Sequence, residues 1–453
     1  MVTKVEFQYS FVNALYSELL ESAVGYFLPG CRLEVLEPIQ PSQAELKFNH
    51  QGEGVPELEW LGSRYTLSNL GKPLTENERK LLQSIGNVLS TRYRLLFNAD
   101  LAARSFHLFR GLPEDRYVSA FLDQAPYAKG QMLTWKTDRI ADAIEVLRIS
   151  SLTTYENRRI ATGVLLFGSQ PDACHSLPPF PTGALRYSDA LTSIRSFHRL
   201  CDGLQTVALV DRDGLLVEIV DIQEWAEAFT GIELPVPSPA RYQAHSHATL
   251  CGGHLCLILT PNGEIKVFAE GAQVFNFQNG RWRLTDALEK YSVWEKAIGN
   301  TNLAEGLFTI ALNLAEDRRG GLFVILDDAQ MANRMLAASD LLSDPNSVTG
   351  GFELGSKDQL HYLLRNKRVL DLASTVLETL ARIDGAIVLD REANLLAFGA
   401  ILRHPLGIEE RTHPTEGGRT TAAIVASRFG NVLKISEDGL ISYFREGQCV
   451  WEM

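Results

Sequence analysis

The stretch Ile383-Asp384-Gly385-Ala386-Ile387-Val388-Leu389 lies where a helix is expected to end and a buried strand to begin. Apolar residues at helical spacing over 369–380 precede it, and an uninterrupted apolar run follows Gly385. An aspartate at such a junction lies at the margin of a sheet, where its carboxylate can hold a metal ion or activate a hydroxyl. The glycine lets the backbone approach a ligand closely. Alone, the tripeptide has a simpler interpretation, because Asp-Gly before a strand is commonly just a turn.

The residues around this stretch predict alternating helices and strands. Upstream, apolar positions over 303–314 fit a helix, and residues 321–326 fit a buried strand. Downstream, hairpins are expected over 386–401 and, as the last element, over 432–444. We therefore expect an α/β or α+β fold with a mixed sheet, in a domain that spans residues 303–453.

A second polar cluster, Glu416-Gly417-Gly418-Arg419-Thr420-Thr421-Ala422-Ala423, follows the first of these hairpins. Paired glycines expose backbone N–H groups that can form an anion-binding nest. Arg419 can donate two hydrogen bonds to phosphate oxygens, and the hydroxyls of Thr420 and Thr421 can add others. If Thr421 starts a helix, the positive end of that helix also favours phosphate. The alternative is a flexible loop with an N-cap threonine.

The third polar cluster is Ser436-Glu437-Asp438-Gly439, at the turn of the last expected hairpin. Glu437 could complete a metal site or contact a ribose. The alternative is an ordinary hairpin turn with solvated carboxylates.

Taken in this order, the three clusters resemble the diadenylate cyclase domain of DNA-integrity-scanning and membrane-associated cyclases. That family shows an Asp-Gly-Ala triplet, then a Gly-x-Arg-His-Arg-Ala-Ala loop, then a hairpin containing Ser-Glu-Glu/Asp. The matching residues here are Asp384-Gly385-Ala386, Gly417 to Ala423, and Ser436 to Gly439. The segment Arg319 to Ile325 is also similar to the family's early Gly-Ala-Leu-Ile-Val-Ile strand.

The resemblance implies a nucleotide-binding domain that joins two ATP molecules into cyclic di-AMP and releases pyrophosphate. Two domains would meet face to face, each holding one ATP, so we expect a homo-oligomer that is at least a dimer. The implied cofactor is Mg²⁺ or Mn²⁺. Asp384 and Glu437 are the implied catalytic residues, with Asp384 also the metal ligand. The implied nucleotide-binding residues are Gly385, Ala386, Gly417, Gly418, Arg419, Thr420, Thr421 and Ser436.

The chain departs from the family at the phosphate-binding loop. The family's Arg-His-Arg is here Arg419-Thr420-Thr421, so neutral donors replace two cationic or titratable side chains. Two other interpretations stay open. One is a cyclase-derived domain that binds or senses an adenine nucleotide without turnover, and the other is a scaffold that serves only oligomerisation. The altered loop favours the sensor, whereas the intact Asp384-Gly385-Ala386 favours the enzyme.

Two further regions are expected upstream, both of which could regulate the C-terminal domain. Residues 1–105 predict a small α+β module, similar in layout to GAF or PAS sensors. In it, Thr75 and Glu78 fit a capping box before a closing helix. Residues 106–290 predict an α/β domain with apolar strands and hairpins.

The region 106–290 shares an order of features with the C-terminal region. Leu209-Val210-Asp211-Arg212 resembles Val388-Leu389-Asp390-Arg391, and the hairpin at Gly263 matches the one at Gly439 in its spacing. At the place of the Asp-Gly-Ala triplet stands Gln205-Thr206-Val207. One interpretation is a degenerate, non-catalytic repeat; the other is that hairpins in general share turn chemistry.

A cluster of histidines and cysteines occupies residues 245–256. Its nitrogen and sulfur atoms are the ligands that zinc prefers, but its spacing matches no common zinc finger. The alternative is that these side chains pack within the domain or line a cleft. The members of the cluster are His245, His247, Cys251, His254 and Cys256.

The composition limits the class of protein. A net charge of −12 argues against broad binding to nucleic acid or acidic membranes. Six cysteines in 453 residues are too few for a disulfide scaffold and favour a reducing compartment. The N-terminus lacks the apolar core of a signal peptide, and no uncharged apolar stretch approaches the roughly 18 residues of a membrane span. We therefore expect a cytoplasmic protein whose partners are ATP or another adenine nucleotide and copies of itself.

Overall fold

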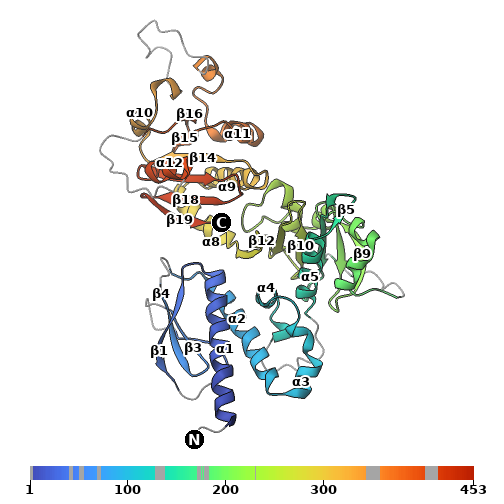
Figure 1. The fold of residues 1–453 in the computed structure, drawn as a ribbon. Coiled ribbons are helices and arrows are strands. Elements are labelled where there is room, and N and C mark those ends of the chain that lie inside the picture. Colours follow the sequence, from blue (N-terminus) through green and yellow to red (C-terminus); the bar gives the residue numbers. More distant parts are fainter. Residues whose placement is uncertain are drawn as a thin grey trace. The chain divides into compact units, whose positions relative to one another are not determined.

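The computed structural model describes residues 4–39, 44–49, 56–68, 73–127, 138–170, 175, 177, 183–229, 231–342, 358–403 and 417–453. The chain forms two compact units, which we call the N-terminal unit (Met1–Glu233 with Ala244–Asp286) and the C-terminal unit (Leu234–Gln243 with Ala287–Met453). Each unit combines helices with sheets, as the expected fold class requires (Figure 1). The finer division into three regions stays a prediction.

The N-terminal unit begins with a small α+β arrangement. Its antiparallel sheet has the strand order β1-β4-β3-β2. The predicted capping box is confirmed: Thr75 caps α2, and the side chain of Glu78 accepts a hydrogen bond from the backbone of Thr75 at 2.9 Å. The elements are α1 (Lys4–Phe27), β1 (Arg32–Pro38), β2 (Lys47–Asn49), β3 (Glu57–Trp60), β4 (Ser63–Ser68) and α2 (Glu76–Leu96).

Short helices then lead to a seven-stranded sheet with the order β13-β12-β11-β10-β7-β8-β9. Within this sheet β7 and β8 are parallel, and the other neighbouring strands are antiparallel. The helices are α3 (Ala99–Arg104), α4 (Pro113–Leu122), α5 (Arg139–Ser151), α6 (Ile222–Glu227) and α7 (Gln243–Ala248). The strands are β7 (Thr162–Leu166), β8 (Thr206–Val210), β9 (Leu216–Asp221), β10 (Leu255–Leu259), β11 (Ile265–Ala269), β12 (Ala272–Gln278) and β13 (Arg281–Leu284), and β5 (Thr154–Tyr155) pairs separately with β6 (Arg158–Arg159).

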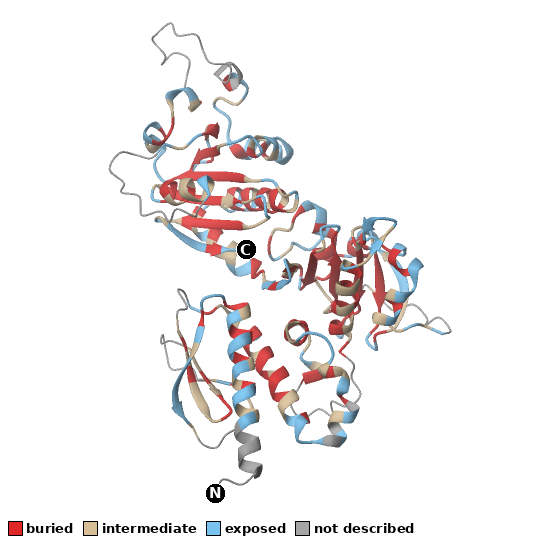
Figure 2. Ribbon diagram, viewed as in Figure 1, coloured by how far each residue is buried: buried red, intermediate tan, exposed pale blue. Residues whose placement is uncertain are grey.

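One continuous apolar core runs through the N-terminal unit. It joins Leu20 of α1 and Ile85 of α2 to Ile144 of α5 and Val164 of β7, all of them fully buried. Figure 2 shows the central strands of the seven-stranded sheet as buried, whereas β1 at the edge of the small sheet is mostly exposed. The burial of this shared apolar surface is the main stabilising contribution to the unit.

The C-terminal unit contains a six-stranded sheet with the order β16-β15-β14-β17-β18-β19. Within this sheet β14 and β15 are parallel, and the other neighbouring strands are antiparallel. The strands are β14 (Gly321–Leu326), β15 (Ala386–Asp390), β16 (Leu395–Ala400), β17 (Gly430–Ile435), β18 (Ile441–Arg445) and β19 (Gln448–Glu452). The helices are α8 (Ala287–Ile298), α9 (Thr301–Glu316), α10 (Ala332–Met335), α11 (Ser374–Ala381) and α12 (Gly418–Ala426).

Helices cover both faces of this sheet (Figure 1). Phe444 of β18 belongs to a buried cluster with Ala423 and Ala426 of α12. The neighbouring Tyr443 points to the opposite face, because side chains alternate along a strand. There its ring packs on Trp294 of α8, with the ring centroids 5.3 Å apart. A sheet that is covered on both sides requires apolar residues on both faces, which explains its unbroken apolar runs.

Two sequence-based predictions differ from the structure in this unit. The helix expected over 369–380 begins only at Ser374, because Leu372 and Ala373 have extended ψ angles of 138° and 142°. The backbone N–H of Val369 donates a hydrogen bond to the carbonyl of Ala393 at 2.7 Å. That tertiary bond ties Val369 to the turn between β15 and β16. The hairpin over 432–444 is also not the last element, because a turn at Gly447 leads into β19.

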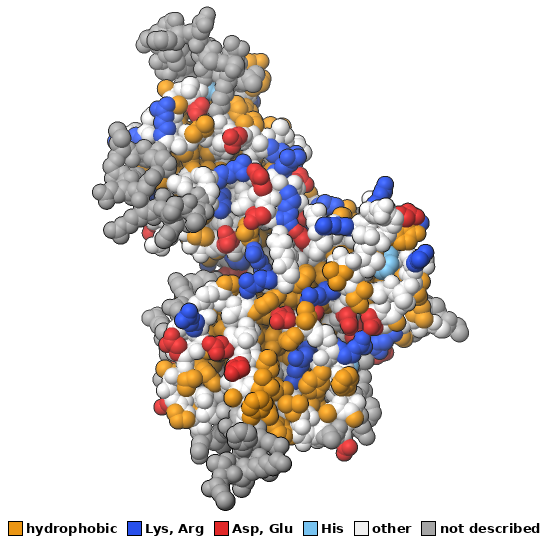
Figure 3. Space-filling model, viewed as in Figure 1, with side chains coloured by type: hydrophobic (Ala, Val, Ile, Leu, Met, Phe, Trp, Pro, Cys, Tyr) orange, Lys and Arg blue, Asp and Glu red, His pale blue; other side chains and the backbone are white. Residues whose placement is uncertain are grey.

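No helix in the part of the chain that the structure describes is long and apolar enough to cross a membrane. Acidic and basic side chains are interspersed on the face shown in Figure 3.

A buried polar cluster anchors the start of α5. Asp138 caps this helix and accepts hydrogen bonds from the hydroxyls of Ser119 and Tyr127. It also forms an ion pair with Arg116 at 3.2 Å, in which the two side chains are only 1% and 3% exposed. Removing one partner of such a pair leaves a buried charge without compensation.

We therefore expect Asp138→Ala to lower the free energy of unfolding of the N-terminal unit by about 3–5 kcal/mol. Urea unfolding followed by tryptophan fluorescence measures this loss. Glu218→Ala, at an exposed position of β9, is the matched control and should change stability by less than about 0.5 kcal/mol. A loss below about 1 kcal/mol for Asp138→Ala would show that the cluster is not an anchor.

Candidate functional site

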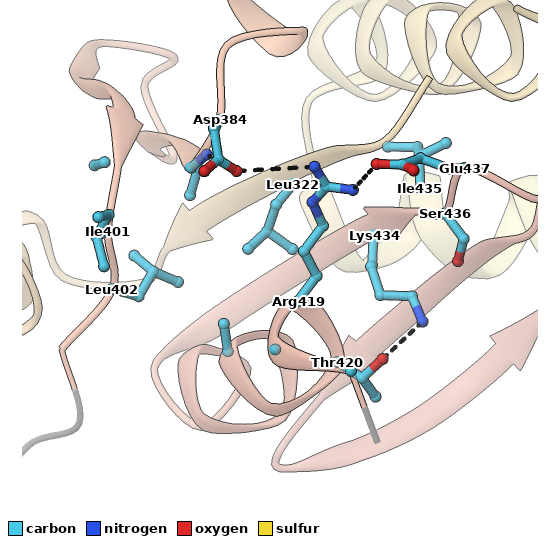
Figure 4. A pocket seen from close by; sticks show the side chains of 16 residues that line it. Leu322, Asp384, Ile401, Leu402, Arg419, Thr420, Lys434, Ile435, Ser436 and Glu437 are labelled. Atoms are coloured by element: carbon cyan, nitrogen blue, oxygen red, sulfur yellow. Dashed lines mark hydrogen bonds and ion pairs between the residues drawn. The ribbon is translucent and has the colours of Figure 1, made fainter. Parts of the chain in front are cut away.

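The three polar clusters meet at one pocket on an edge of the six-stranded sheet. The pairing of the strands explains why they meet. Because β14 and β15 are parallel, both begin at this edge; because β16 and β17 run antiparallel to them, both end there. The pocket has a volume of about 710 Å³ and is drawn in Figure 4. Its lining residues are Leu322, Asp384, Gly385, Ala386, Ala400, Ile401, Leu402, Gly417, Gly418, Arg419, Thr420, Ala422, Lys434, Ile435, Ser436 and Glu437.

The triplet Asp384-Gly385-Ala386 forms the start of β15. Gly385 has a φ of +108°, and a Cβ atom there would lie 2.5 Å from the backbone carbon of Gly399 in β16. Only glycine fits this close approach of two backbones. Ala386 pairs with Ala400 in β16 and is buried, so its methyl group packs in the core and does not face solvent. The triplet therefore presents the exposed carboxylate of Asp384 at the mouth of the pocket.

The glycine-rich cluster forms the N-terminus of α12 and not a nest. Gly417 is the N-cap, with φ −65° and ψ 155°, and neither glycine has a positive φ. A nest requires successive residues whose backbone conformations are right-handed and then left-handed, so the predicted nest is wrong. The predicted helix is present but begins at Gly418 and not at Thr421, and its N-cap is a glycine and not a threonine. Its positive end, where backbone N–H groups are unsatisfied within the helix, borders the pocket.

Arg419 lies between the two carboxylates of the pocket (Figure 4). Its guanidinium is 3.0 Å from Glu437 and 3.8 Å from Asp384. The side chains of Arg419, Asp384 and Glu437 are 39%, 96% and 72% exposed. Exposed ion pairs contribute only about 0–1 kcal/mol, so a bound phosphate can compete for the guanidinium. Room for Arg419 depends on Gly320, where a Cβ atom would lie 2.0 Å from the guanidinium nitrogen.

Lys434 is a pocket residue that the sequence-based interpretation missed. It lies in β17, and its ammonium donates a hydrogen bond to the hydroxyl of Thr420 at 3.1 Å (Figure 4). A signal was present in the sequence, since Lys434 stands alone as a charge between Leu433 and Ile435 in an apolar strand. Its position brings a second cation to the start of α12.

The remaining predicted residues divide into two groups. Ser436 and Glu437 line the pocket, and the backbone of Ser436 closes the β17–β18 turn by accepting a hydrogen bond from the N–H of Gly439 at 3.0 Å. Thr421 does not line the pocket, although it belongs to the same helical turn as Thr420. Glu416 lies outside the described residues.

One side of the pocket is apolar. Leu322, Ile401 and Leu402 face the polar side chains across it (Figure 4). Binding sites for small molecules commonly combine such a wall with a few convergent polar groups. With two cations, two carboxylates and a helix N-terminus opposite, the pocket has groups suited to an anion that brings a divalent cation.

The histidine and cysteine cluster of residues 245–256 does not come together as a zinc site. Among the residues that the structure describes, no group of three or more His, Cys, Asp or Glu side chains could hold a metal ion. A ring nitrogen of His245 lies 2.9 Å from the carbonyl of Gly203. The Nδ1 atom of His254 accepts a hydrogen bond from the N–H of Gly168 at 2.9 Å. These side chains support the N-terminal unit, which agrees with the packing alternative.

No family model and no curated protein matches the sequence. Several solved structures match part of it, among them the following two. A hypothetical membrane spanning protein from Bacillus cereus is 19% identical, with a TM-score of 0.26, over 35% of this chain and 69% of that one. A double mutant of DacA from Staphylococcus aureus is 18% identical, with a TM-score of 0.19, over 35% of this chain and 87% of that one. At these TM-scores the similarity assigns no function to the pocket.

The tight approach at Gly385 leads to a prediction about the pocket. Gly385→Ala places a side chain in a left-handed conformation and against the backbone of β16, which cannot move aside cheaply. We expect it to lower the free energy of unfolding of the C-terminal unit by about 1–3 kcal/mol. Thermal unfolding of the full chain measures the effect.

Gly306→Ala in α9 is the matched control, because a Cβ atom there meets nothing within 4 Å. It should leave stability unchanged or raise it by up to about 1 kcal/mol. If both variants unfold like the parent, the contact between β15 and β16 at Gly385 is looser than the structure has it.

Proposed function

We propose that the C-terminal unit binds ATP in this pocket and, with a second such unit, condenses two ATP molecules into cyclic di-AMP and pyrophosphate. One observation carries the proposal. Three clusters that are far apart in the sequence, and that resemble the diadenylate cyclase motifs only as an ordered set, line the same pocket. Their order in the chain and their meeting in space are independent of each other.

The anion-binding half of the pocket fits a polyphosphate. Arg419 and Lys434 supply two positive charges, and the N-terminus of α12 adds its dipole beside them. The hydroxyl of Thr420, already in contact with Lys434, can donate a further hydrogen bond to an oxygen. A triphosphate has enough oxygens to engage all of these groups at once.

The carboxylate half fits a divalent cation. Asp384 and Glu437 offer oxygen ligands, and Mg²⁺ typically takes one or two carboxylates together with phosphate oxygens. They would hold a Mg²⁺ or Mn²⁺ ion, whose chemistry is to neutralise charge on the phosphates. In the structure Arg419 pairs with both carboxylates instead. Arg419 is then free for phosphate once a cation takes its place, so binding of the cation and of the nucleotide should support each other.

The proposed reaction needs two nucleotides. The 3′-hydroxyl of each ATP attacks the α-phosphate of the other, forming a phosphodiester bond while the bond to pyrophosphate breaks. In this proposal Asp384 would orient the attacking hydroxyl, and Arg419 would stabilise the developing charge on phosphate. The role of adenine as the base comes from the family resemblance, and Leu322, Ile401 and Leu402 offer the apolar surface on which a base can lie.

A second candidate function is nucleotide sensing without turnover. The observation that favours it is the loop Arg419-Thr420-Thr421, where the related loop carries Arg-His-Arg. Thr421 does not reach the pocket, so it does not replace the lost arginine. Lys434, in strand β17, supplies one of the positive charges that the loop lacks relative to Arg-His-Arg. We therefore favour the enzyme.

The first test of the proposal is nucleotide binding. Arg419→Ala and Lys434→Ala should each weaken ATP binding roughly ten- to hundredfold, since a hydrogen bond to a charged group contributes about 1.5–3 kcal/mol. Isothermal titration with ATP and Mg²⁺ measures this. Arg391→Ala is the matched control, because Arg391 pairs with Asp327 away from the pocket. Equal affinities for all four proteins would place the nucleotide elsewhere.

The second test is turnover. Incubation with ATP and Mn²⁺, followed by chromatography, should yield cyclic di-AMP and pyrophosphate. Asp384→Asn keeps the size of the side chain but loses its charge, and we expect turnover to fall on the order of a hundredfold. ATP binding with no cyclic dinucleotide at high protein concentration would rule out the cyclase and leave the sensor. Unchanged turnover in Asp384→Asn would remove this carboxylate from the mechanism.

A further inference from the structure

The two large sheets of the chain have the same topology. From one edge, the order is β9-β8-β7-β10-β11-β12 in the N-terminal unit and β16-β15-β14-β17-β18-β19 in the C-terminal unit. In each sheet only the second and third strands of this order pair in parallel. Each central strand also follows a helix that packs against it, α5 before β7 and α9 before β14. The N-terminal sheet adds only β13 at its far edge.

Irregularities of the strands coincide as well. The register of β8 and β9 shifts between Leu209 and Val210, two residues before Asp211 at the end of the strand. The register of β15 and β16 also shifts between Val388 and Leu389, at the same distance from Asp390, and it has a further shift between Ala386 and Val388 that β8 and β9 lack. Both aspartates are buried. General properties of hairpins do not place a bulge at one particular residue of a strand.

The next hairpins agree residue by residue. The register shift of β11 and β12 falls just before Phe268, and that of β18 and β19 just before Phe444. Each sheet then has a turn made by a glutamate and a glycine, both with positive φ. These are Glu270 (53°) with Gly271 (79°), and Glu446 (53°) with Gly447 (78°). Two-residue hairpin turns require positive φ at both positions, and Asn279 with Gly280 makes the same turn elsewhere in the N-terminal sheet. The agreement therefore lies in the position of the turn, two residues after the matching Phe268 and Phe444.

We propose that the sheet of the N-terminal unit is a second copy of the nucleotide-binding fold that has lost its pocket, so that one chain holds one nucleotide and the second must come from another copy of this chain. This inference rests on the proposed function for the C-terminal pocket. It deepens that function, because two copies of the fold in one chain would otherwise allow both nucleotides to be held within it.

The matching positions of the first copy lack every charge of the pocket. We align the two copies on their matching turn glycines, Gly263 and Gly439. At the same distance before the glycine, Pro261 then takes the place of Glu437, and Ile258 takes the place of Lys434. Counted in the same way, Gln243 at the start of α7 stands for Arg419 at the start of α12. Gln205, two residues before the first apolar residue of β8, stands for Asp384. Neither cation and neither carboxylate has a counterpart, so phosphate and a divalent cation lose their partners.

Side chains and backbone pack closely at the matching place in the first copy. His245 of α7 is fully buried, and its ring nitrogen lies 2.9 Å from the carbonyl of Gly203, in the segment before β8. This contact joins α7 to the segment before β8. In the C-terminal unit the corresponding elements, α12 and the segment before β15, line the pocket. A Cβ atom at Gly203 would lie 2.4 Å from the carbonyl oxygen of Thr162, so this segment packs directly on the start of β7.

The histidine does not offer a replacement charge. Burial lowers the pKa of His245 to about 4, so the ring is neutral at pH 7. The first copy therefore keeps the folded sheet but lacks the charged groups of the C-terminal pocket, and His245 bridges the matching elements. A reaction between two nucleotides then needs the C-terminal pockets of two chains.

Equilibrium dialysis of the full chain tests the inference, with α,β-methylene-ATP and Mg²⁺ as the probe because this analogue resists attack at its α-phosphate. We expect one nucleotide per chain at saturation. The combined Arg419→Ala and Lys434→Ala variant should reduce this to none. Gln205→Ala and Gln243→Ala, at the matching positions of the first copy, are the controls and should leave one nucleotide per chain with unchanged affinity.

Two nucleotides per chain, falling to one in the combined pocket variant, would overturn the inference while leaving the proposed function intact. A loss of binding in Gln205→Ala or Gln243→Ala would do the same, since it would place a nucleotide in the first copy. No binding by the parent chain would overturn both. The three outcomes differ in the number of nucleotides that each parent chain binds and in which variant changes that number.

Discussion

The parallel pairing of β14 with β15 is the constraint on which the candidate site depends. Within a sheet that is otherwise antiparallel, this one pair brings the starts of two strands and the ends of their two outer neighbours to the same edge. Loops at that edge come from distant parts of the sequence, and each contributes one polar cluster. The helices on both faces keep the strands in register, so the pocket rests on a rigid support.

The pocket balances its own charge. Arg419 and Lys434 together match the charge of the two carboxylates: Arg419 pairs with both through exposed ion pairs, while Lys434 donates a hydrogen bond to the hydroxyl of Thr420. Interactions of this kind are weak in water, so they orient the groups without opposing a ligand that brings both phosphate and a cation. An acidic protein can therefore present a local anion site, because the relevant field is that of the few groups around the pocket.

If the two sheets are copies, as we propose, the fold has been kept where the site was lost. The features that the sheets share, including their bulges, turns and buried aspartates, belong to the apolar core and the strand connections. The features that differ are side chains at the sheet edge, such as Gln205 where the other copy has Asp384. Exchanging charged edge residues costs little stability, whereas changing the core costs much. One copy can therefore lose its pocket and still support the N-terminal unit.

The sequence alone determined the local structure: the strand over 321–326 and the capping box at Thr75. These depend on short-range sterics and on hydrogen bonds between near neighbours. Tertiary structure decided which groups meet. It made the paired glycines a helix start, it placed Lys434 of an apolar strand beside the start of α12, and it left Thr421 outside the pocket. Such outcomes depend on strand pairing between segments far apart in the chain, and no local pattern records that pairing.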